Sequence, residues 1–316
     1  MSHRKVKVAV VGTGSLGQHH ARIYSELDAV ELVGVYDVDE ARAREIAEKN
    51  KTRTFDALDA LAEQAEAASV VVPTDLHREV AGGLIEKGLH VLIEKPIAAT
   101  TAEAEELVAL ARRHDVIVQV GHVERFNPVL SYLEGVAKNP RFIEAHRLAP
   151  YPPPREGLHP RGTEVSVILD LMIHDLEVIL HLVGSEVKTI HAVGVPVLSP
   201  SEDIANVRLA FQNGCVANVT ASRVSPERMR KIRVFMEDTY ISLDYQNQGG
   251  ELYRKGGMGI AREEVPIEKG EPLANQLRAF AECVARRDEP MVSGEHAAEA
   301  LNLAVEIIHR LREGAS

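Results

Sequence analysis

Short apolar runs alternate with helix-like stretches along the first 120 residues, and this alternation restricts the possible folds more than any other feature. The runs that suit strands buried on both faces are Val6–Val11, Glu31–Asp37, Ser69–Pro73, Val91–Glu94 and Val116–Val120. Amphipathic stretches with a helical period separate these runs. Strands joined through helices need crossover connections, which predicts a doubly wound parallel sheet of the Rossmann type over residues 1–121.

The pattern changes after this region, and a second α/β domain is expected over residues 122–316. A long helix is predicted over about 165–183. Strand-like segments then follow one another from Val187 to Pro266 through short turns, which predicts a mixed, largely antiparallel open sheet. Two more helices within residues 273–312 close the chain, and the last of them could pack back on the first domain.

Composition argues for a globular protein whose ligand is a small molecule. With 45% apolar residues, the 316-residue chain can build two cores, and no apolar run approaches the roughly 20 residues of a membrane span. The first residues lead straight into a strand without a signal peptide, so we expect a cytoplasmic protein. Cys215 and Cys283 are too few and too far apart for a disulfide framework or a metal cluster. A net charge of −11 without a long basic stretch argues against nucleic acid.

A glycine-rich G-x-G-x-x-G motif directly follows the first predicted strand. Its members are Gly12, Thr13, Gly14, Ser15, Leu16 and Gly17. The first glycine permits a tight turn, the second lets the backbone approach a diphosphate, and the third lets the helix pack on the strand. The helix N-terminus then offers N–H groups and a positive dipole end to phosphates. By itself the motif also fits an ordinary glycine-rich turn.

A carboxylate at the end of the second strand makes the motif more specific. Asp37 lies 20 residues beyond Gly17, where a dinucleotide-binding domain places an acidic residue that binds the adenosine ribose. This carboxylate would repel a 2′-phosphate, so NAD is favoured over NADP. Asp39 adds negative charge, although a helix N-cap explains it equally well.

Two further motifs extend the comparison to the rest of the chain. Glu94-Lys95-Pro96 is expected after the fifth strand, and Asp170 and His174 lie four residues apart on the long helix of the second domain. Together with the glycine motif they make the sequence similar to the Gfo/Idh/MocA oxidoreductases over nearly its whole length. The resemblance implies an NAD-dependent enzyme that oxidises a sugar or polyol hydroxyl, and a cis bond before Pro96.

The resemblance also implies the catalytic residues. Lys95 would hydrogen-bond the reacting hydroxyl and stabilise its developing negative charge. His174 is suited to accept the proton, and Asp170 would either orient that transfer or hold the sugar. Whether Lys95 or His174 is the base stays open. Glu177 and His181 continue the same helical stripe and are interpreted as a solvated face. One helix alone offers these side chains, so no metal is expected.

The family pattern assigns further positions around the same site. The cofactor positions are Pro73, Thr74, His77, Glu94, Lys95 and Gln119. In the crossover Glu124–Pro128, Arg125 would face the cofactor or the substrate. Asn127 would face the substrate, together with Lys95, Asp170 and His174. For His77 and His122, a buried histidine with its hydrogen bonds satisfied is the alternative interpretation.

The stretches Gly121–Pro128 and Val167–Glu177 are most similar to family members that oxidise nucleotide sugars, which implies oxidation at C3 of a UDP-N-acetylhexosamine. Arg147, Arg155 and Arg161, in or beside a proline-rich loop, could clamp the diphosphate, although ordinary surface arginines are as good an interpretation.

Three alternatives stay open: a dehydrogenase of free sugars or inositol-like polyols, a glycosidase of the family that recycles its NAD, and a non-catalytic NAD sensor. The predicted second sheet has one helix-covered face. Its other face would need a partner, so we expect a homodimer or homotetramer.

Overall fold

A computed structural model describes residues 4–154, 160, 162–256 and 259–314. The chain forms two compact units. The first unit joins Met1–Val123 to Glu271–Ala298, and the second joins Glu124–Gly270 to Glu299–Ser316. The division therefore differs from the expected boundary at residue 121, because the chain returns to the first unit near its end. The physical reason is α8 (Pro272–Arg286), whose apolar face enters the core of the first unit.

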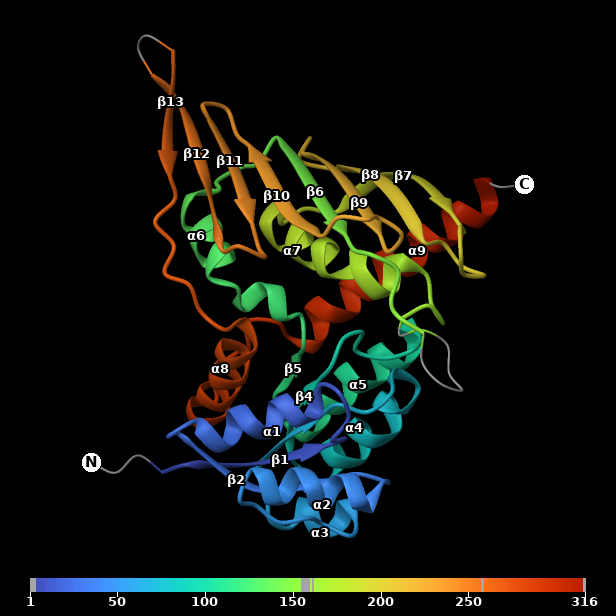
Figure 1. The fold of residues 1–316 in the computed structure, drawn as a ribbon, viewed down its shortest axis with the longest axis vertical. Helices are drawn as coiled ribbons and strands as arrows, with labels where there is room; N and C mark the ends of the chain where they lie inside the picture. The colour runs from blue at the N-terminus through green and yellow to red at the C-terminus, as the bar shows by residue number, and fades with distance from the viewer. Residues whose placement is uncertain (1–3, 155–159, 161, 257–258, 315–316) are drawn as a thin grey trace. The chain divides into compact units, whose positions relative to one another are not determined.

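The first unit contains the predicted parallel sheet, which has five strands in the order β2-β1-β3-β4-β5 (Figure 1). Its strands are β1 (Val6–Val11), β2 (Val30–Tyr36), β3 (Ala67–Val70), β4 (His90–Ile93) and β5 (Val118–Val120). The other helices of this unit are α1 (Gly17–Glu26), α2 (Glu40–Lys49), α3 (Leu58–Ala62), α4 (His77–Glu86) and α5 (Thr101–His114). Side chains of α1, α2 and α8 share one core with β1 and β2, while α4 and α5 pack on each other.

The five strands expected from the apolar runs all form. Between α2 and α3 the chain makes only an isolated parallel bridge, Val35 to Thr54, at the edge of the sheet. The Glu94-Lys95-Pro96 motif therefore follows the fourth strand and not the fifth. Its position at the carboxyl end of a central strand is unchanged, and this is where parallel sheets bind ligands.

The second unit contains an eight-stranded sheet in the order β13-β12-β11-β10-β6-β9-β8-β7. Its strands are β6 (Phe142–Leu148), β7 (Val187–Val195), β8 (Ile204–Phe211), β9 (Val216–Ser222), β10 (Met229–Phe235), β11 (Thr239–Asp244), β12 (Gly249–Gly256) and β13 (Gly259–Glu264). Only β6 and β9 pair in parallel, and the other neighbours are antiparallel. This confirms the mixed, largely antiparallel sheet.

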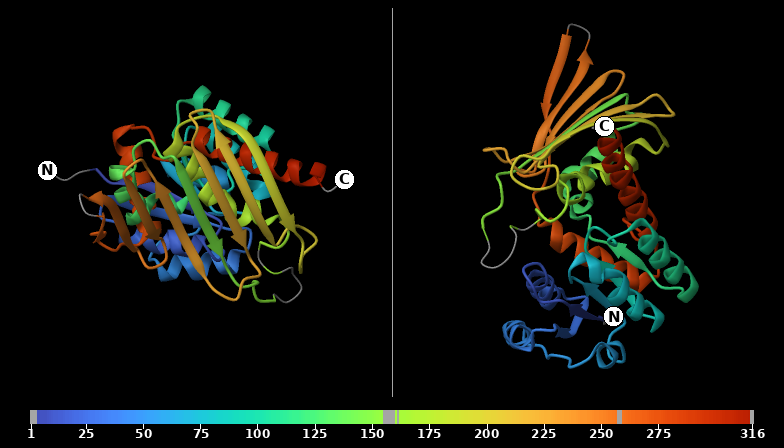
Figure 2. Two further views of the ribbon diagram at one scale, coloured as in Figure 1. Left: turned by 90° about the horizontal axis from the view of Figure 1, so that it is seen from above. Right: turned by 90° about the vertical axis from the view of Figure 1, so that its right-hand side faces the viewer.

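Helices lie on one face of this sheet (Figure 2). They are α6 (Pro128–Val136), α7 (Ile173–Val183) and the second-unit part of α9 (Gly294–Gly314). Strand residues of alternating register, such as Ile143, Val207 and Val234, are fully buried on that face. Among the described residues, no helix covers the opposite face in the views of Figure 2.

The helix expected over 165–183 is not a single α-helix. Its first part is a π-helical turn, Ile168–Met172, and α7 follows without a break until Gly184, whose φ of 56° ends it. A π turn closes i→i+5 hydrogen bonds and widens the helix, and such turns occur frequently at functional sites. Asp170 lies in this turn and His174 in the first turn of α7.

Within the described part of the chain, no helix combines the length and the apolar character that crossing a bilayer requires.

Candidate active site

The glycine motif forms the tight turn between β1 and α1. Gly12 has a φ of 89°, and a Cβ on it would overlap with the carbonyl oxygen of Val71. A Cβ on Gly17 would overlap with the carbonyl oxygen of Gly12, because α1 starts directly against the strand end. At Gly14, by contrast, no atom lies within 4 Å of such a Cβ. The turn thus keeps an open face at its middle glycine, which fits the approach of a diphosphate.

Asp37 is oriented by the same turn. One carboxylate oxygen accepts hydrogen bonds from the Thr13 N–H at 2.6 Å and the Thr13 hydroxyl at 2.9 Å, and the other accepts the Asp39 N–H at 3.0 Å. Burial opposes ionisation, but these hydrogen bonds and Arg42 outweigh it and hold the pKa of Asp37 below its usual range. The carboxylate is therefore charged and half exposed beside the glycine turn, as a ribose ligand requires. Asp39 is the N-cap of α2.

The carboxyl end of β4 carries Glu94 and Lys95. The Lys95–Pro96 peptide bond is cis, as the family resemblance implied. The Glu94 carboxylate lies against Gly121, where a Cβ would be 2.8 Å from it, and 3.2 Å from the Nε2 of the buried His20. Burial opposes the ionisation of Glu94, but His20 and Lys95 outweigh it and lower its pKa. The Lys95 side chain is half buried.

Sequence reasoning missed His20, and its position is the signal that could have identified it. His20 lies three residues beyond Gly17, so its side chain belongs to the first turn of α1.

The same unit also buries a pair of amide side chains, those of Gln119 and Gln276. Gln119 donates to the Gln276 carbonyl oxygen at 3.3 Å, while Gln119 Oε1 and both amide atoms of the Gln276 side chain have no hydrogen-bond partner among the described residues. Both side chains are fully buried, so these amide groups lie in the interior of the unit.

His77 is a structural residue in this structure. It is buried, and its two ring nitrogens lie 2.9 Å from the Pro96 carbonyl oxygen and 3.0 Å from that of Val72. Burial lowers the pKa of His77, although the two carbonyl oxygens favour its charged form. The ring therefore ties the loop after β3 to the loop after β4 and does not reach a ligand. Pro73 and Thr74 lie exposed and half-exposed at the start of that first loop.

In the second unit, the structure brings Asp170 and His174 together on consecutive helical turns. Both side chains are half buried, while their helical neighbours Met172 and Ile173 are fully buried. Gly162, at the end of the proline-rich loop, lies directly on the Asp170 carboxylate, because a Cβ there would overlap with it. Two polar groups are thus half buried on consecutive turns of one helix.

Arg147 does not have the role that the sequence suggested. It is 4% exposed, and its guanidinium is fully occupied by carboxylates: Asp175 at 2.7 and 3.0 Å and Glu124 at 2.9 Å. Burial opposes the ionisation of Glu124, but Arg147 outweighs it and lowers the pKa of Glu124. The expected diphosphate clamp is wrong for Arg147, because its donors are already paired inside the protein. Strand alternation could have revealed this, since Arg147 shares the inward face of β6 with Ile143 and Ala145.

Arg125 and Asn127 belong to the same interior. Arg125 is 3% exposed and contacts Glu177 at 2.7 Å and Glu134 at 3.3 Å. Asn127 caps α6 and donates to Glu124 at 3.2 Å. Their expected contact with the substrate is therefore corrected to a structural role.

Glu177 is also not on a solvated face. It is 2% exposed, and burial raises its pKa to about 7 although Arg125 opposes the shift. His181, 38% exposed at its side chain, lies 3.1 Å from Glu134. In the described part of the chain, no three His, Cys, Asp or Glu side chains are placed to share a metal ion. Arg155 and Arg161 lie outside the described residues.

Two profiles of known families match the chain. One, described as an oxidoreductase family with an NAD-binding Rossmann fold, matches residues 6–122. The other, the GFO/IDH/MocA C-terminal domain, matches residues 134–242. The two matches cover the glycine motif, Lys95, Asp170 and His174.

Two relatives are similar over nearly their whole length. UDP-N-acetylglucosamine 3-dehydrogenase of Acidithiobacillus ferrooxidans is 35% identical over 309 residues, which cover 96% of each chain. Myo-inositol 2-dehydrogenase of Thermotoga maritima is 27% identical over 325 residues and 94% of each chain. A solved structure of the Acidithiobacillus enzyme has a TM-score of 0.91 to this chain at 34% identity and covers 98% of both chains.

Proposed function

Because the chain belongs to the Gfo/Idh/MocA family of NAD-binding oxidoreductases, we propose that it oxidises the C3 hydroxyl of a UDP-N-acetylhexosamine to a ketone. The observation that carries this proposal is its 35% identity, over 96% of both chains, to a UDP-N-acetylglucosamine 3-dehydrogenase. The chain also has the polar residues that such a reaction needs, Lys95, Asp170 and His174. All three side chains are half buried and therefore partly accessible to solvent.

The first unit would hold NAD through the glycine turn and Asp37. Gly14 leaves space for the diphosphate, and the ionised Asp37 carboxylate would accept the ribose hydroxyls. Glu94, half buried beside Lys95, would line the same pocket. When bound, NAD supplies the acceptor for the hydride.

Lys95 and His174 would act on the substrate hydroxyl, where a proton leaves and negative charge develops. In this proposal the Lys95 ammonium donates to the hydroxyl oxygen and stabilises the negative charge that develops there. The proton passes either to His174, while Lys95 stays an ammonium, or to Lys95 in its neutral amine form, and Asp170 orients that transfer or holds the sugar. Since Arg147 is paired in the interior, Arg161 is the residue that this proposal retains for the diphosphate.

A second candidate function is the oxidation of a free polyol. It is favoured by the 27% identity to a myo-inositol 2-dehydrogenase over 94% of both chains. The two functions differ in the ligand and not in the redox step. An NAD-recycling glycosidase, in contrast, would release a leaving group without net NADH.

The experiment that tests the proposal measures NADH formation with UDP-N-acetylglucosamine, UDP-N-acetylgalactosamine, UDP-glucose, free N-acetylglucosamine and myo-inositol. We expect turnover with the UDP-N-acetylhexosamines only. Turnover restricted to myo-inositol would replace the proposal by the second candidate, and phenol released from an aryl glycoside without NADH would indicate the glycosidase.

Lys95→Ala provides the site control for that assay. We expect it to lower kcat by about 10²- to 10⁴-fold and to leave NAD affinity within about twofold, because the ammonium acts on the hydroxyl oxygen. Full activity of Lys95→Ala would remove Lys95 from the catalytic site.

We also propose a cytoplasmic homodimer or homotetramer formed through the open face of the second sheet. A row of aromatic rings crosses four adjacent strands on that face: Phe142, Phe235, Tyr240 and Tyr253, with neighbouring centroids 4.5–5.4 Å apart. The chain has six phenylalanines and seven tyrosines, and four of these residues lie half buried in this row. Such a concentration favours a protein interface.

Cys215 and Cys283 are buried and free, in keeping with a reducing compartment.

A further inference from the structure

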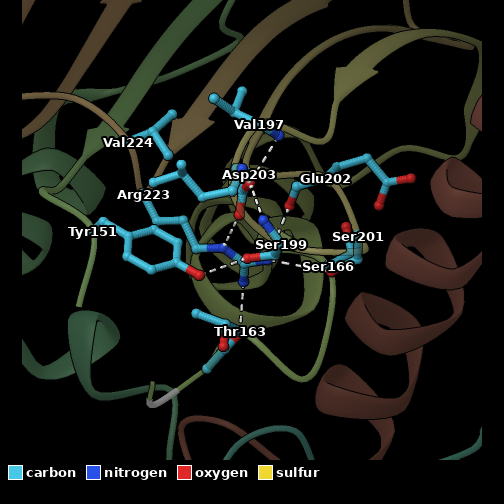
Figure 3. Close-up of polar contacts among 12 residues, drawn as sticks. Tyr151, Thr163, Ser166, Val197, Ser199, Ser201, Glu202, Asp203, Arg223 and Val224 are labelled. Atoms are coloured by element: carbon cyan, nitrogen blue, oxygen red, sulfur yellow. Dashed lines mark hydrogen bonds and ion pairs between the residues drawn. The ribbon is translucent and has the colours of Figure 1, made fainter. Parts of the chain in front are cut away.

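Arg223 is a buried arginine that no sequence motif points to. It directly follows β9 and is 2% exposed. Its Nε donates to an Asp203 carboxylate oxygen at 2.7 Å, and its backbone N–H donates to the Asp203 carbonyl oxygen at 2.9 Å (Figure 3). Asp203 directly precedes β8, which pairs with β9. The ion pair therefore joins the adjacent ends of two neighbouring strands.

The Asp203 carboxylate is saturated by the protein itself. Its second oxygen accepts the N–H groups of Val197 at 2.9 Å, Leu198 at 2.6 Å and Ser199 at 2.8 Å. Burial opposes the ionisation of Asp203, but the hydrogen bonds from Ser199 and Arg223 outweigh it and hold its pKa well below the usual range. Asp203 thus presents a fixed anion to Arg223, and a fixed anion sets the orientation of the planar guanidinium.

The two terminal nitrogens of Arg223 bind different segments, and one of them reaches the segment that precedes the π turn. One Nη donates to the carbonyl oxygens of Gly162 at 2.6 Å and Val165 at 2.8 Å. The other Nη donates to the Ser201 hydroxyl at 3.2 Å and the Glu202 carbonyl oxygen at 3.3 Å. One side chain therefore holds two carbonyl groups of the 162–165 segment against the ends of two strands.

That segment bears directly on Asp170. Gly162 has a φ of 82°, and a Cβ on it would overlap with the Asp170 carboxylate, so its backbone is in van der Waals contact with that group. The carbonyl group of Gly162 is the same one that Arg223 holds. We propose that Arg223, fixed by Asp203, is a positioning residue for the reaction: it sets the backbone on which the Asp170 carboxylate rests. This inference depends on the catalytic or sugar-holding role of Asp170 in the proposed function.

A double-mutant cycle tests the inference. Arg223→Lys keeps the charge beside Asp203 but loses the fork that reaches two carbonyl oxygens. We expect it to lower kcat/KM by about 10²-fold, because a displacement of about 1 Å at a reacting group costs that much. In an Asp170→Ala background, Arg223→Lys should cause almost no further loss. Gly162→Ala places a methyl group on the Asp170 carboxylate and also strains the backbone at a φ of 82°, so it should lower kcat/KM when Asp170 is present.

Several readouts separate positioning from stability alone. We expect NAD affinity, measured by titration, to stay within about twofold in all variants, because the glycine turn and Asp37 lie in the other unit. Arg310→Lys, in a surface ion pair with Glu306, is the matched control and should keep full activity. If the losses from Arg223→Lys and Asp170→Ala simply multiply, the inference is overturned.

The test also stands apart from the substrate proposal. The cycle uses whichever alcohol the wild-type enzyme oxidises, so a failure with UDP-sugars alone leaves it intact. If Arg223→Lys does not fold, Gly162→Ala decides the question, because it leaves the Arg223–Asp203 pair untouched. A Gly162→Ala enzyme with unchanged kcat/KM would also overturn the inference.

Discussion

Glu177 shows how one buried group makes the stability of this protein depend on pH. Its pKa is raised to about 7 by burial, so between the ordinary carboxyl pKa and about 7 the folded protein binds a proton that the unfolded chain does not. The contribution of Glu177 to stability is therefore complete at low pH and is lost as pH rises through about 7. We expect Glu177→Gln to abolish this loss, which is on the order of 1–3 kcal/mol between about pH 5 and about pH 8.5. Urea unfolding at several pH values measures it.

Glu134 offers the matched control, because it contacts the same Arg125. Burial opposes its ionisation, but His181 and Arg125 outweigh that effect and lower its pKa. Its contribution is lost only as pH falls below the ordinary carboxyl range. Glu134→Gln should therefore keep the loss of stability above about pH 6, moved to somewhat lower pH, because the Glu134 charge contributes to the raised pKa of Glu177. A Glu177→Gln profile parallel to that of the wild type would contradict the assignment of Glu177.

At the scale of elements, the junction of β1 and α1 determines both the fold and the cofactor site of the first unit. Gly17→Ala places a methyl group on the Gly12 carbonyl oxygen, so we expect it to lower the free energy of unfolding by roughly 2 kcal/mol or more and to weaken NAD binding. Gly14→Ala meets no atom within 4 Å. It should keep the stability and still raise the Kd for NAD by about 10-fold or more, because the methyl fills the space for the diphosphate.

Thermal unfolding and NAD titration of the two variants give the comparison. The pair separates packing from binding, because the two glycines belong to one turn but face different neighbours. Wild-type NAD affinity in Gly14→Ala would show that the diphosphate binds elsewhere.

At the scale of the whole molecule, the open face of the second sheet governs assembly. Tyr240 stacks on both Phe235 and Tyr253, so a charge at its position would be buried in any interface that uses the aromatic row. We expect Tyr240→Glu to reduce the mass in solution, measured by light scattering, to that of the monomer. Val38→Glu, at an apolar side chain that is 89% exposed in the first unit, should leave the mass unchanged. An unaltered mass for Tyr240→Glu would place the interface elsewhere.

Local pattern was enough to predict much of this protein. The period of the apolar runs predicted the parallel sheet and the change to an antiparallel one, because strand and helix periods are properties of consecutive residues. The glycine motif predicted the turn at Gly12 and Gly17 and the carboxylate at Asp37, since each depends on backbone geometry within one βα unit. The family resemblance predicted the cis bond before Pro96.

Only the tertiary structure decided which charged side chains are enclosed. Arg125 and Arg147 looked like ligands for a substrate, but the sheet and its helices bring carboxylates from distant segments to meet them. Arg223 and Asp203 are likewise 20 residues apart and become partners because β8 pairs with β9. A buried charge persists only where opposite charges or hydrogen bonds surround it, and those partners are chosen by packing across elements rather than by neighbours in the chain.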